Sequence, residues 1–371
     1  MQTGESVLGE MDLALIHALQ IAPRASWTQL SAVLGASPDT LARRWEHLTA
    51  GGYAWAGFLA QPPNTGALVC AWVEVTCTPG FSEAAAIELS GDPDTLIVSR
   101  VTGDTDLLLL VMCPGLDGLD DYLVGRVRRL PGVAATQTQV ITGIHSNRDL
   151  WELDQLTPRQ RRQLAELSGP ATGTRPASAS GSVTPGSGRG SGPGSVRSRA
   201  RRPAARLSEL DVALVLELAG DARRTAAELA RICEVSESTV RRRLDVLVNG
   251  GALIHHCSPA PRFSGRPMWA MIKAEVPPLG TPAAVTALAR LRQNCLVTSV
   301  TGPHNLAIGG WLRSVDELYE LTTAIERTTP SIRIAATSLS LRIHKTGAQV
   351  LGPDGRRRDC VRPEARLLSS A

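Results

Sequence analysis

Residues 236–251 read SESTVRRRLDVLVNGG, and residues 37–52 read SPDTLARRWEHLTAGG. The two stretches stand 199 positions apart, and this same offset superposes residues 12–145 on residues 211–344 without a net gap. The matches are of several chemical kinds: Asp12 with Asp211, Arg43-Arg44 with Arg242-Arg243, Val101-Thr102-Gly103 with Val300-Thr301-Gly302, Pro131 with Pro330, and His145 with His344. So long a period predicts a duplicated domain unit rather than a solenoid, whose repeats run to tens of residues.

Each copy opens with three short segments whose apolar residues recur at helical spacing. Ser37 and Ser236 stand where the third helix needs an N-cap, and Pro38 suits the first helical turn. The double glycines that follow suit the C-terminal cap. This order predicts a helix-turn-helix head in each copy.

After each head, the apolar period changes from that of a helix to that of a strand. Strand-like runs alternate with helical runs in the order βαββαβ, which predicts a ferredoxin-like domain. The fold class is therefore α+β, with two copies of a winged or three-helix helix-turn-helix head followed by a ferredoxin-like domain. The predicted strands of copy one are 68–78, 95–102, 107–113 and 133–142, and those of copy two are 269–276, 296–301, 306–312 and 332–342.

The domain boundaries follow from these patterns and from composition. Residues 168–206 are Gly, Ser, Pro, Ala and Arg with almost no large apolar residue, which predicts a flexible basic linker. A helix near 157–167 is expected before it, with Thr157 as N-cap. The expected units are head one at 8–54, α/β domain one at 66–146, head two at 207–253, α/β domain two at 267–345, and a disordered tail at 346–371.

The composition favours a soluble cytoplasmic protein that meets a polyanion. No signal peptide and no run of about eighteen apolar residues is evident. The seven cysteines include no CxxC spacing, which favours reduced thiols over a zinc site or a disulfide framework. Acidic residues outnumber basic ones before the linker, whereas the linker and the second copy are basic. Arg far outnumbers Lys, which indicates a GC-rich bacterial genome.

The third helix of copy two has the pattern of a DNA recognition helix. On a helical wheel, Arg242 lies opposite the apolar residues, and Ser238 and Thr239 share its outer face. Small polar residues near a helix N-terminus can approach base edges, and Arg can bond guanine with two hydrogen bonds. Arg241 and Arg243 flank that face, where they can meet phosphates. A solvated basic face on a structural helix is the alternative.

The third helix of copy one is a weaker match to that pattern. Asp39, Thr40, Ala42 and Arg43 stand where copy two has Ser238, Thr239, Arg241 and Arg242, and Arg44 follows. The acid near the helix start stabilises the helix dipole but repels phosphate. The two predicted readers of DNA are therefore not equivalent.

With these residues the chain resembles the leucine-responsive regulatory protein and AsnC family of bacterial and archaeal transcription regulators. The resemblance rests on residues 236–247 with the following Asn-Gly-Gly, on Val101-Thr-Gly-Asp-Thr-Asp-Leu-Leu-Leu, and on Leu130-Pro-Gly-Val. It covers nearly the whole chain outside the linker and tail, but the tandem fusion departs from the usual single-unit member. It implies binding to double-stranded DNA and oligomers of identical chains joined through the α/β domains.

The same resemblance implies a small effector, commonly an amino acid, bound near the Gly-x-x-Asp turn between paired α/β domains. In copy one that turn holds Gly103, Asp104 and Asp106. Free backbone N–H groups can hold a carboxylate, and a nearby Asp can pair with an ammonium group. The matching turn of copy two, 302–305, lacks both carboxylates. A tight turn between two strands is the alternative for both copies.

No nucleophile–base pair, phosphate loop or HExxH spacing is present, so no catalytic residue, metal or cofactor is expected. Two other functions stay open. Sirohaem decarboxylases are similar to this family, sometimes as fusions of two units, and use His and Arg near the substrate. His255, His256 and Arg262 follow the second recognition helix, although copy one has no equivalent cluster near Gln61. The other alternative is a sensor or assembly protein without DNA binding.

Overall fold

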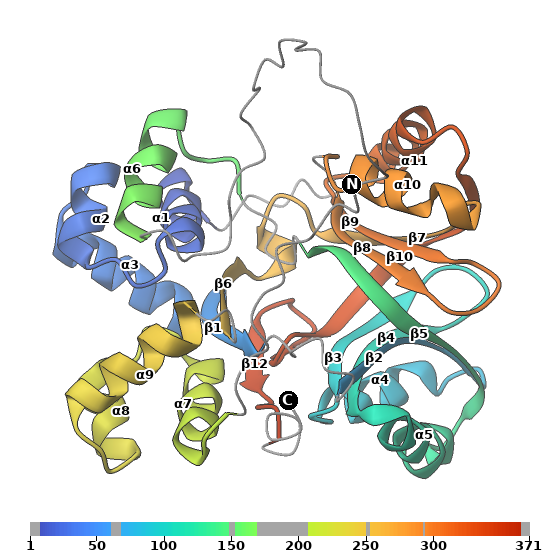
Figure 1. The fold of residues 1–371 in the computed structure, drawn as a ribbon, viewed down its shortest axis with the longest axis horizontal. Helices are drawn as coiled ribbons and strands as arrows, with labels where there is room; N and C mark the ends of the chain where they lie inside the picture. Colours follow the sequence, from blue (N-terminus) through green and yellow to red (C-terminus); the bar gives the residue numbers. More distant parts are fainter. Residues whose placement is uncertain are drawn as a thin grey trace, which may run out of the picture.

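The computed structural model of the chain describes residues 8–60, 68–147, 153–168, 207–249, 253–291 and 294–364. Its elements form a helical lobe, drawn on the left of Figure 1, and a lobe of sheets covered by helices, drawn on the right. The first lobe holds both heads and the second holds both α/β domains. Among the described residues, no helix has the length and apolar character needed to cross a membrane.

Each head consists of three helices and one strand, so the predicted heads are confirmed. Head one comprises α1 (Glu10–Ile21), α2 (Trp27–Leu34), α3 (Pro38–Ala50) and β1 (Ala54–Ala60). Head two comprises α7 (Glu209–Gly220), α8 (Ala226–Ile232), α9 (Glu237–Asn249) and β6 (Leu253–Pro259). Strands β1 and β6 were not predicted from the sequence. They pair antiparallel with each other, across the two copies.

Head one carries a fourth helix, α6 (Pro158–Ser168). As expected, Thr157 caps it, because the Thr157 hydroxyl accepts a hydrogen bond from Gln160 N at 3.3 Å. Leu156 and Leu164 join the core of the heads. The remainder of the expected linker, residues 169–206, lies outside the described residues.

Both α/β domains have the predicted βαββαβ order. Copy one runs β2 (Leu68–Cys77), α4 (Ser82–Ser90), β3 (Thr95–Val101), β4 (Leu107–Pro114), α5 (Gly115–Gly125), a 3-10 turn (Val127–Arg129) and β5 (Val133–Asn147). Copy two runs β7 (Met268–Glu275), α10 (Thr281–Leu288), β8 (Asn294–Val300), β9 (Leu306–Leu312), α11 (Asp316–Thr328) and β10 (Arg333–Thr346), with 3-10 turns at Pro261–Phe263 and Pro278–Gly280.

The two α/β domains are joined by strands that run from one sheet into the other. β5 pairs first with β2 and then with β8, while β10 pairs first with β7 and then with β3. Ile141 stands opposite Val300, and Ser340 stands opposite Val101. Because these two pairs are related by the sequence offset, the duplicated units are arranged about a pseudo-twofold axis. β5 and β10 extend beyond their predicted ends, at 142 and 342, to make these pairings.

The expectation of a disordered tail from residue 346 is wrong for residues 346–364. β11 (Gln349–Leu351) pairs with the end of β10, and β12 (Arg357–Cys360) pairs with β11. Arg357 N donates to Gly52 O at 2.9 Å, and Leu351 packs in a small core with Trp55 of β1. Contacts with head one therefore order a hairpin whose polar composition alone predicts disorder. Residues 365–371 lie outside the described residues.

Candidate nucleic-acid interface and effector turn

The N-terminus of α9 is held by its own side chains. Ser236 Oγ accepts a hydrogen bond from Thr239 N at 3.2 Å and lies 2.9 Å from both Ser238 Oγ and Thr239 Oγ1. This cap satisfies a backbone N–H that the helix itself leaves unpaired. Ser236 and Ser238 are exposed, so the first turn of α9 presents a fixed polar surface to solvent.

The three arginines of α9 have different surroundings. Arg242 is exposed and makes no ion pair with any described residue, whereas Arg241, also exposed, lies 3.1 Å from Glu237 one turn earlier. Arg243 turns inward, and its Nε donates to Asp211 Oδ1 of α7 at 2.8 Å. Burial of the Asp211 carboxyl opposes ionisation, but hydrogen bonds from Arg243 and Ser208 outweigh burial and lower its pKa. Arg243 thus connects α9 to α7. Its guanidinium group pairs with Asp211, whereas the sequence predicted a contact with phosphate.

Helix α3 repeats this arrangement with fewer cations. Ser37 Oγ accepts from Thr40 N at 3.2 Å, and Arg44 Nη1 donates to Asp12 Oδ1 of α1 at 2.8 Å. Arg43 is exposed at the position of Arg242, and Asp39 is exposed at the helix start. Of the basic residues expected to meet DNA, Arg43, Arg44, Arg241 and Arg242 are therefore exposed, but Arg44 and the half-buried Arg243 pair with an aspartate in the first helix of their heads.

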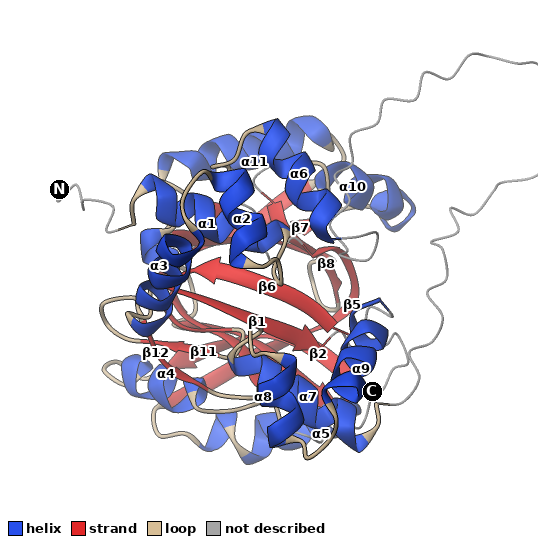
Figure 2. Ribbon diagram, turned by 90° about the vertical axis from the view of Figure 1, so that its left-hand side faces the viewer, coloured by secondary structure: helices blue, strands red, loops and turns tan. Residues whose placement is uncertain are grey.

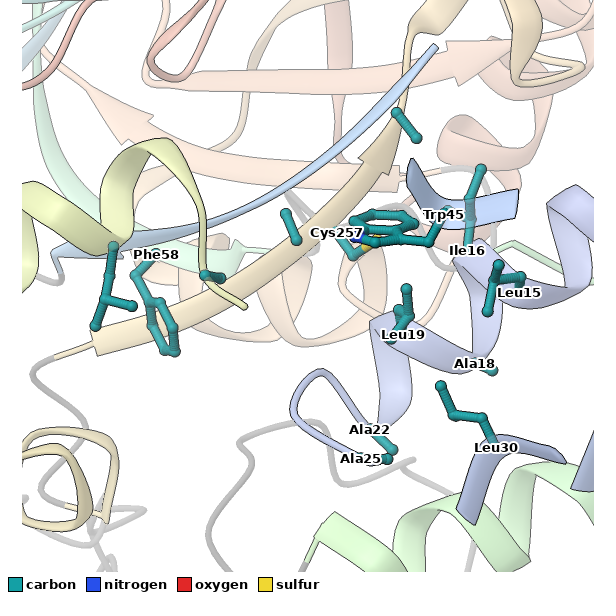
Figure 3. Close-up of a cluster of buried hydrophobic side chains, with 14 of the residues drawn as sticks. Leu15, Ile16, Ala18, Leu19, Ala22, Ala25, Leu30, Trp45, Phe58 and Cys257 are labelled. Atoms are coloured by element: carbon teal, nitrogen blue, oxygen red, sulfur yellow. The ribbon is translucent and has the colours of Figure 1, made fainter. Parts of the chain in front are cut away.

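The two heads share one hydrophobic core. It combines α1 and α3 side chains such as Leu19 and Trp45 with Leu214 and Leu247 of head two and Cys257 of β6. Figure 3 shows Trp45 and Leu19 in the same cluster as Cys257. Figure 2 shows α3 and α9 on opposite sides of the β1–β6 ribbon. The shared core fixes the spacing of the two third helices.

Two arginines bind the heads together symmetrically. Arg24 donates to Ala222 O at 2.9 Å and to Arg224 O at 3.1 Å, while Arg223 donates to Pro23 O at 2.7 Å and to Ala25 O at 3.1 Å. Burial lowers the pKa of both guanidinium groups. This pair was not predicted from the sequence, although the offset places Arg24 on Arg223 and each lies just before a helix cap.

The predicted effector turn lies at the junction of the two copies. Thr102 N donates to Leu339 O of β10 at 2.9 Å, and Gly103 has a φ of +109° with open space beside it. Asp104 is exposed, but Asp106 Oδ2 accepts a hydrogen bond from Cys77 N at 2.7 Å. In copy two, Asn305 Oδ1 accepts from Val276 N at 3.0 Å in the same way. Asp106 is therefore a strand-bridging residue, and only Asp104 has a carboxylate turned to solvent.

The histidines considered for decarboxylase chemistry lie inside the head-to-head contact. Both ring nitrogens of His255 are buried without a hydrogen-bond partner among the described residues, and its ring meets Phe58 of β1 edge-on at 5.3 Å. His256 is 5% exposed, and burial lowers its pKa to about 4. Arg262 lies against Gly355 of the C-terminal hairpin.

Comparison with protein families matches both heads and one α/β domain. The model of the AsnC-type helix-turn-helix domain matches residues 8–49 and 207–247, and the model of the Lrp/AsnC ligand binding domain matches residues 70–150. Both heads and the first α/β domain thus match the two domain types of the Lrp/AsnC family of helix-turn-helix transcription regulators, here in a tandem form with two heads.

Two Pyrococcus regulators each match about one repeat unit of the chain. An uncharacterised HTH-type transcriptional regulator of Pyrococcus horikoshii is 24% identical over 138 residues, which are 37% of this chain and 87% of that protein. An uncharacterised HTH-type regulator of Pyrococcus furiosus is 29% identical over 139 residues, which are 37% of this chain and 94% of that protein.

Solved structures of a siroheme decarboxylase match the tandem arrangement over most of the chain. The siroheme decarboxylase NirDL, in complex with an iron-uroporphyrin III analogue, has a TM-score of 0.54 at 15% identity. The match covers 91% of this chain and 93% of that chain. At this identity, the likeness shows a shared fold.

Proposed function

We propose that the chain is a sequence-specific DNA-binding transcription regulator that responds to a small effector and has no catalytic activity. It acts on double-stranded DNA in the cytoplasm. The observation that carries this proposal is the pair of capped third helices, held apart at a fixed spacing by one shared core and presenting Arg242 and Arg43 at equivalent exposed positions.

The side chains of these helices suit direct reading of the major groove. Ser238, Thr239 and Arg242 would meet base edges, while Arg241 and the cap residue Ser236 would meet the phosphate backbone. In head one, Thr40 and Arg43 have the corresponding roles, Ser37 caps the helix, and Asp39 disfavours a nearby phosphate. Arg44 and Arg243 support the reading helices through their ion pairs with Asp12 and Asp211.

Selection of bound fragments from the source genome, followed by mobility-shift titration at several salt concentrations, tests this proposal. The expected result is nanomolar binding to selected fragments that weakens steeply with salt, and much weaker binding to random DNA. Equal affinity for selected and random fragments would exclude sequence-specific reading.

For the effector, we propose an amino acid or a similar zwitterion bound at the turn of copy one. The amides around Gly103 can hold its carboxylate, and the exposed carboxylate of Asp104 can pair with its ammonium group. Asp106 contributes by fixing the turn through Cys77. Calorimetry with the common amino acids tests this site: Asp104→Ala should remove the heat of binding, whereas Asp106→Asn should keep it, because Asn305 makes the equivalent bond in copy two. Equal heats from Asp104→Ala and the unaltered protein would refute the site.

A decarboxylase-like enzyme is the second candidate, favoured by the fold likeness to siroheme decarboxylase over nearly the whole chain. The burial of His255 and His256 between the heads weighs against it. Purification with a porphyrin-type absorbance band, together with loss of carbon dioxide from added sirohaem, would support this candidate over the regulator.

A further inference from the structure

The sheets of the two copies face each other across the pseudo-twofold axis, and the charged residues near this axis differ between the copies. Glu74 of β2 and Lys273 of β7 occupy equivalent positions in the repeat. Glu74 Oε1 lies 2.5 Å from Lys273 Nζ, and the side chains are only 8% and 16% exposed. In a twofold pair of identical units, a residue beside the axis faces its own counterpart. Pairing like copies would therefore bury two carboxylates or two ammonium groups together.

The apolar residues around this ion pair are also complementary in size. Trp72 and Leu108 of copy one pack against Met271 and Ala307 of copy two, and these side chains leave no space for a ligand. In the repeat, Trp72 is equivalent to Met271 and Leu108 to Ala307. Two copy-one sheets would bring two tryptophans and two leucines to the axis, and two copy-two sheets would leave a gap. Both overfilling and cavities destabilise a packed interface.

The head-to-head contact shows the same difference. Gly57 stands opposite His256 at the centre of the β1–β6 pairing, and these two residues are equivalent in the repeat. A Cβ atom at position 57 would lie 2.7 Å from Nε2 of His256, so the imidazole ring occupies space that only glycine leaves open. If two copy-two heads met, each His256 ring would collide with the Cβ atom of the other.

We propose that the facing surfaces of copy one and copy two are specific for each other and reject a second copy of themselves. The partner that fits each surface is the other half of the same chain. An ordinary family member would need two chains to make this pairing, whereas this protein makes it within one chain. A buried ion pair adds little net stability over an apolar pair, but an unpaired buried charge is costly, and that cost selects the partner. Arg24 and Arg223 donate to backbone carbonyl groups, which are present in both copies, so these contacts do not select the partner.

The test uses the full chain with a protease site inserted among residues 169–206. After folding and cleavage, two preparations with different mass labels are mixed, partly unfolded in denaturant and refolded together. Native mass spectrometry then gives the composition of every complex of two halves. The proposal predicts mixed pairs of copy one with copy two and no pairs of like halves. Pairs of like halves at the statistical ratio would overturn it.

Three variants separate partner choice from stability. Glu74→Lys should weaken the association of the cleaved halves by roughly 100-fold or more, and adding Lys273→Glu should restore most of it. Glu74→Gln with Lys273→Met keeps the volume and removes the charges, so the halves should still associate while pairs of like halves become detectable. Asp120→Lys, a charge reversal at an exposed position of α5, should change neither composition nor affinity.

A measurement on the uncleaved chain covers the case in which separated halves do not refold. The denaturant midpoints of Glu74→Lys and Lys273→Glu should both fall, and the double exchange should return most of the loss. If the single variants unfold at the same denaturant midpoint as the unaltered protein, the proposal is overturned. The buried charges would then impose no choice of partner.

Discussion

In the proposed mode of DNA binding, some side chains on the outer face of α9 contact bases and others contact phosphates. Arg242 is exposed and follows the capped first turn of α9, whereas Arg241 forms an ion pair with Glu237. We expect Arg242→Ala to cost about 1 to 3 kcal/mol of binding free energy and to relax base preference. Arg241→Ala should weaken all sequences more evenly and reduce the salt dependence. Mobility-shift titrations of selected and random duplexes measure both effects, and unchanged binding by Arg242→Ala would contradict the assignment.

His256 makes the stability of the paired heads dependent on pH. Its pKa is lowered by burial to about 4, whereas an exposed histidine in the unfolded chain titrates near 6.5. The unfolded chain therefore binds more protons between these values, and the free energy of unfolding falls as pH decreases from about 6.5 to 4. The full loss from this residue is about 3 kcal/mol.

Denaturant unfolding at several pH values between 4 and 8 checks this dependence. His256→Phe should flatten the slope below pH 6.5 without removing it, because burial also lowers the pKa of His255. A variant that keeps the full slope would show that other groups control the acid sensitivity.

The C-terminal hairpin links the sheets to the heads. Besides the Arg357 contacts to Gly52 and Thr49, Arg362 Nη1 lies 2.8 Å from Glu217 Oε1 of α7. Leu351 is 5% exposed against Trp55, so Leu351→Ala should cost about 2 to 3 kcal/mol of stability and loosen β1. Hydrogen exchange of β1 and β12 measures the loosening. Leu341→Ala, at a leucine that is 64% exposed, is the matched control and should leave exchange unchanged.

Local sequence patterns predicted the elements whose partners lie nearby in the chain. Helix spacing with caps at Ser37 and Ser236 identified the third helices, and strand alternation identified both βαββαβ domains. β1, β6 and the last residues of β5 and β10 were not predicted, because each of these segments pairs with a strand of the other copy. The hairpin was missed for a similar reason, since it is ordered by contact with head one.

Candidate site residues were predicted less well than elements, because their partners depend on tertiary structure. A helical wheel placed Arg243 beside Arg242 but could not show Asp211 of α7 within reach. Asp106 likewise matched a family turn, while its bond to Cys77 N depends on the pairing of neighbouring strands. Arg24 and Arg223 were visible only as one more match in the repeat.

The complete chain combines an approximate twofold arrangement with unlike halves. The registers of β1 with β6 and of β5 and β10 with β8 and β3 preserve the repeat offset. The third helices of the two heads nevertheless differ, because α3 has Asp39 and Ala42 where α9 has Ser238 and Arg241. One chain should therefore read two different half-sites, spaced by about one turn of DNA or a multiple of it.

Hydroxyl-radical footprinting on a selected genomic fragment, with equivalent variants of the two heads, tests this arrangement. We expect two protected segments of unlike sequence, with Arg242→Ala weakening protection of one segment and Arg43→Ala weakening protection of the other. Protection of a perfect palindrome, or loss at the same segment in both variants, would contradict the reading of DNA by two unlike heads within one chain.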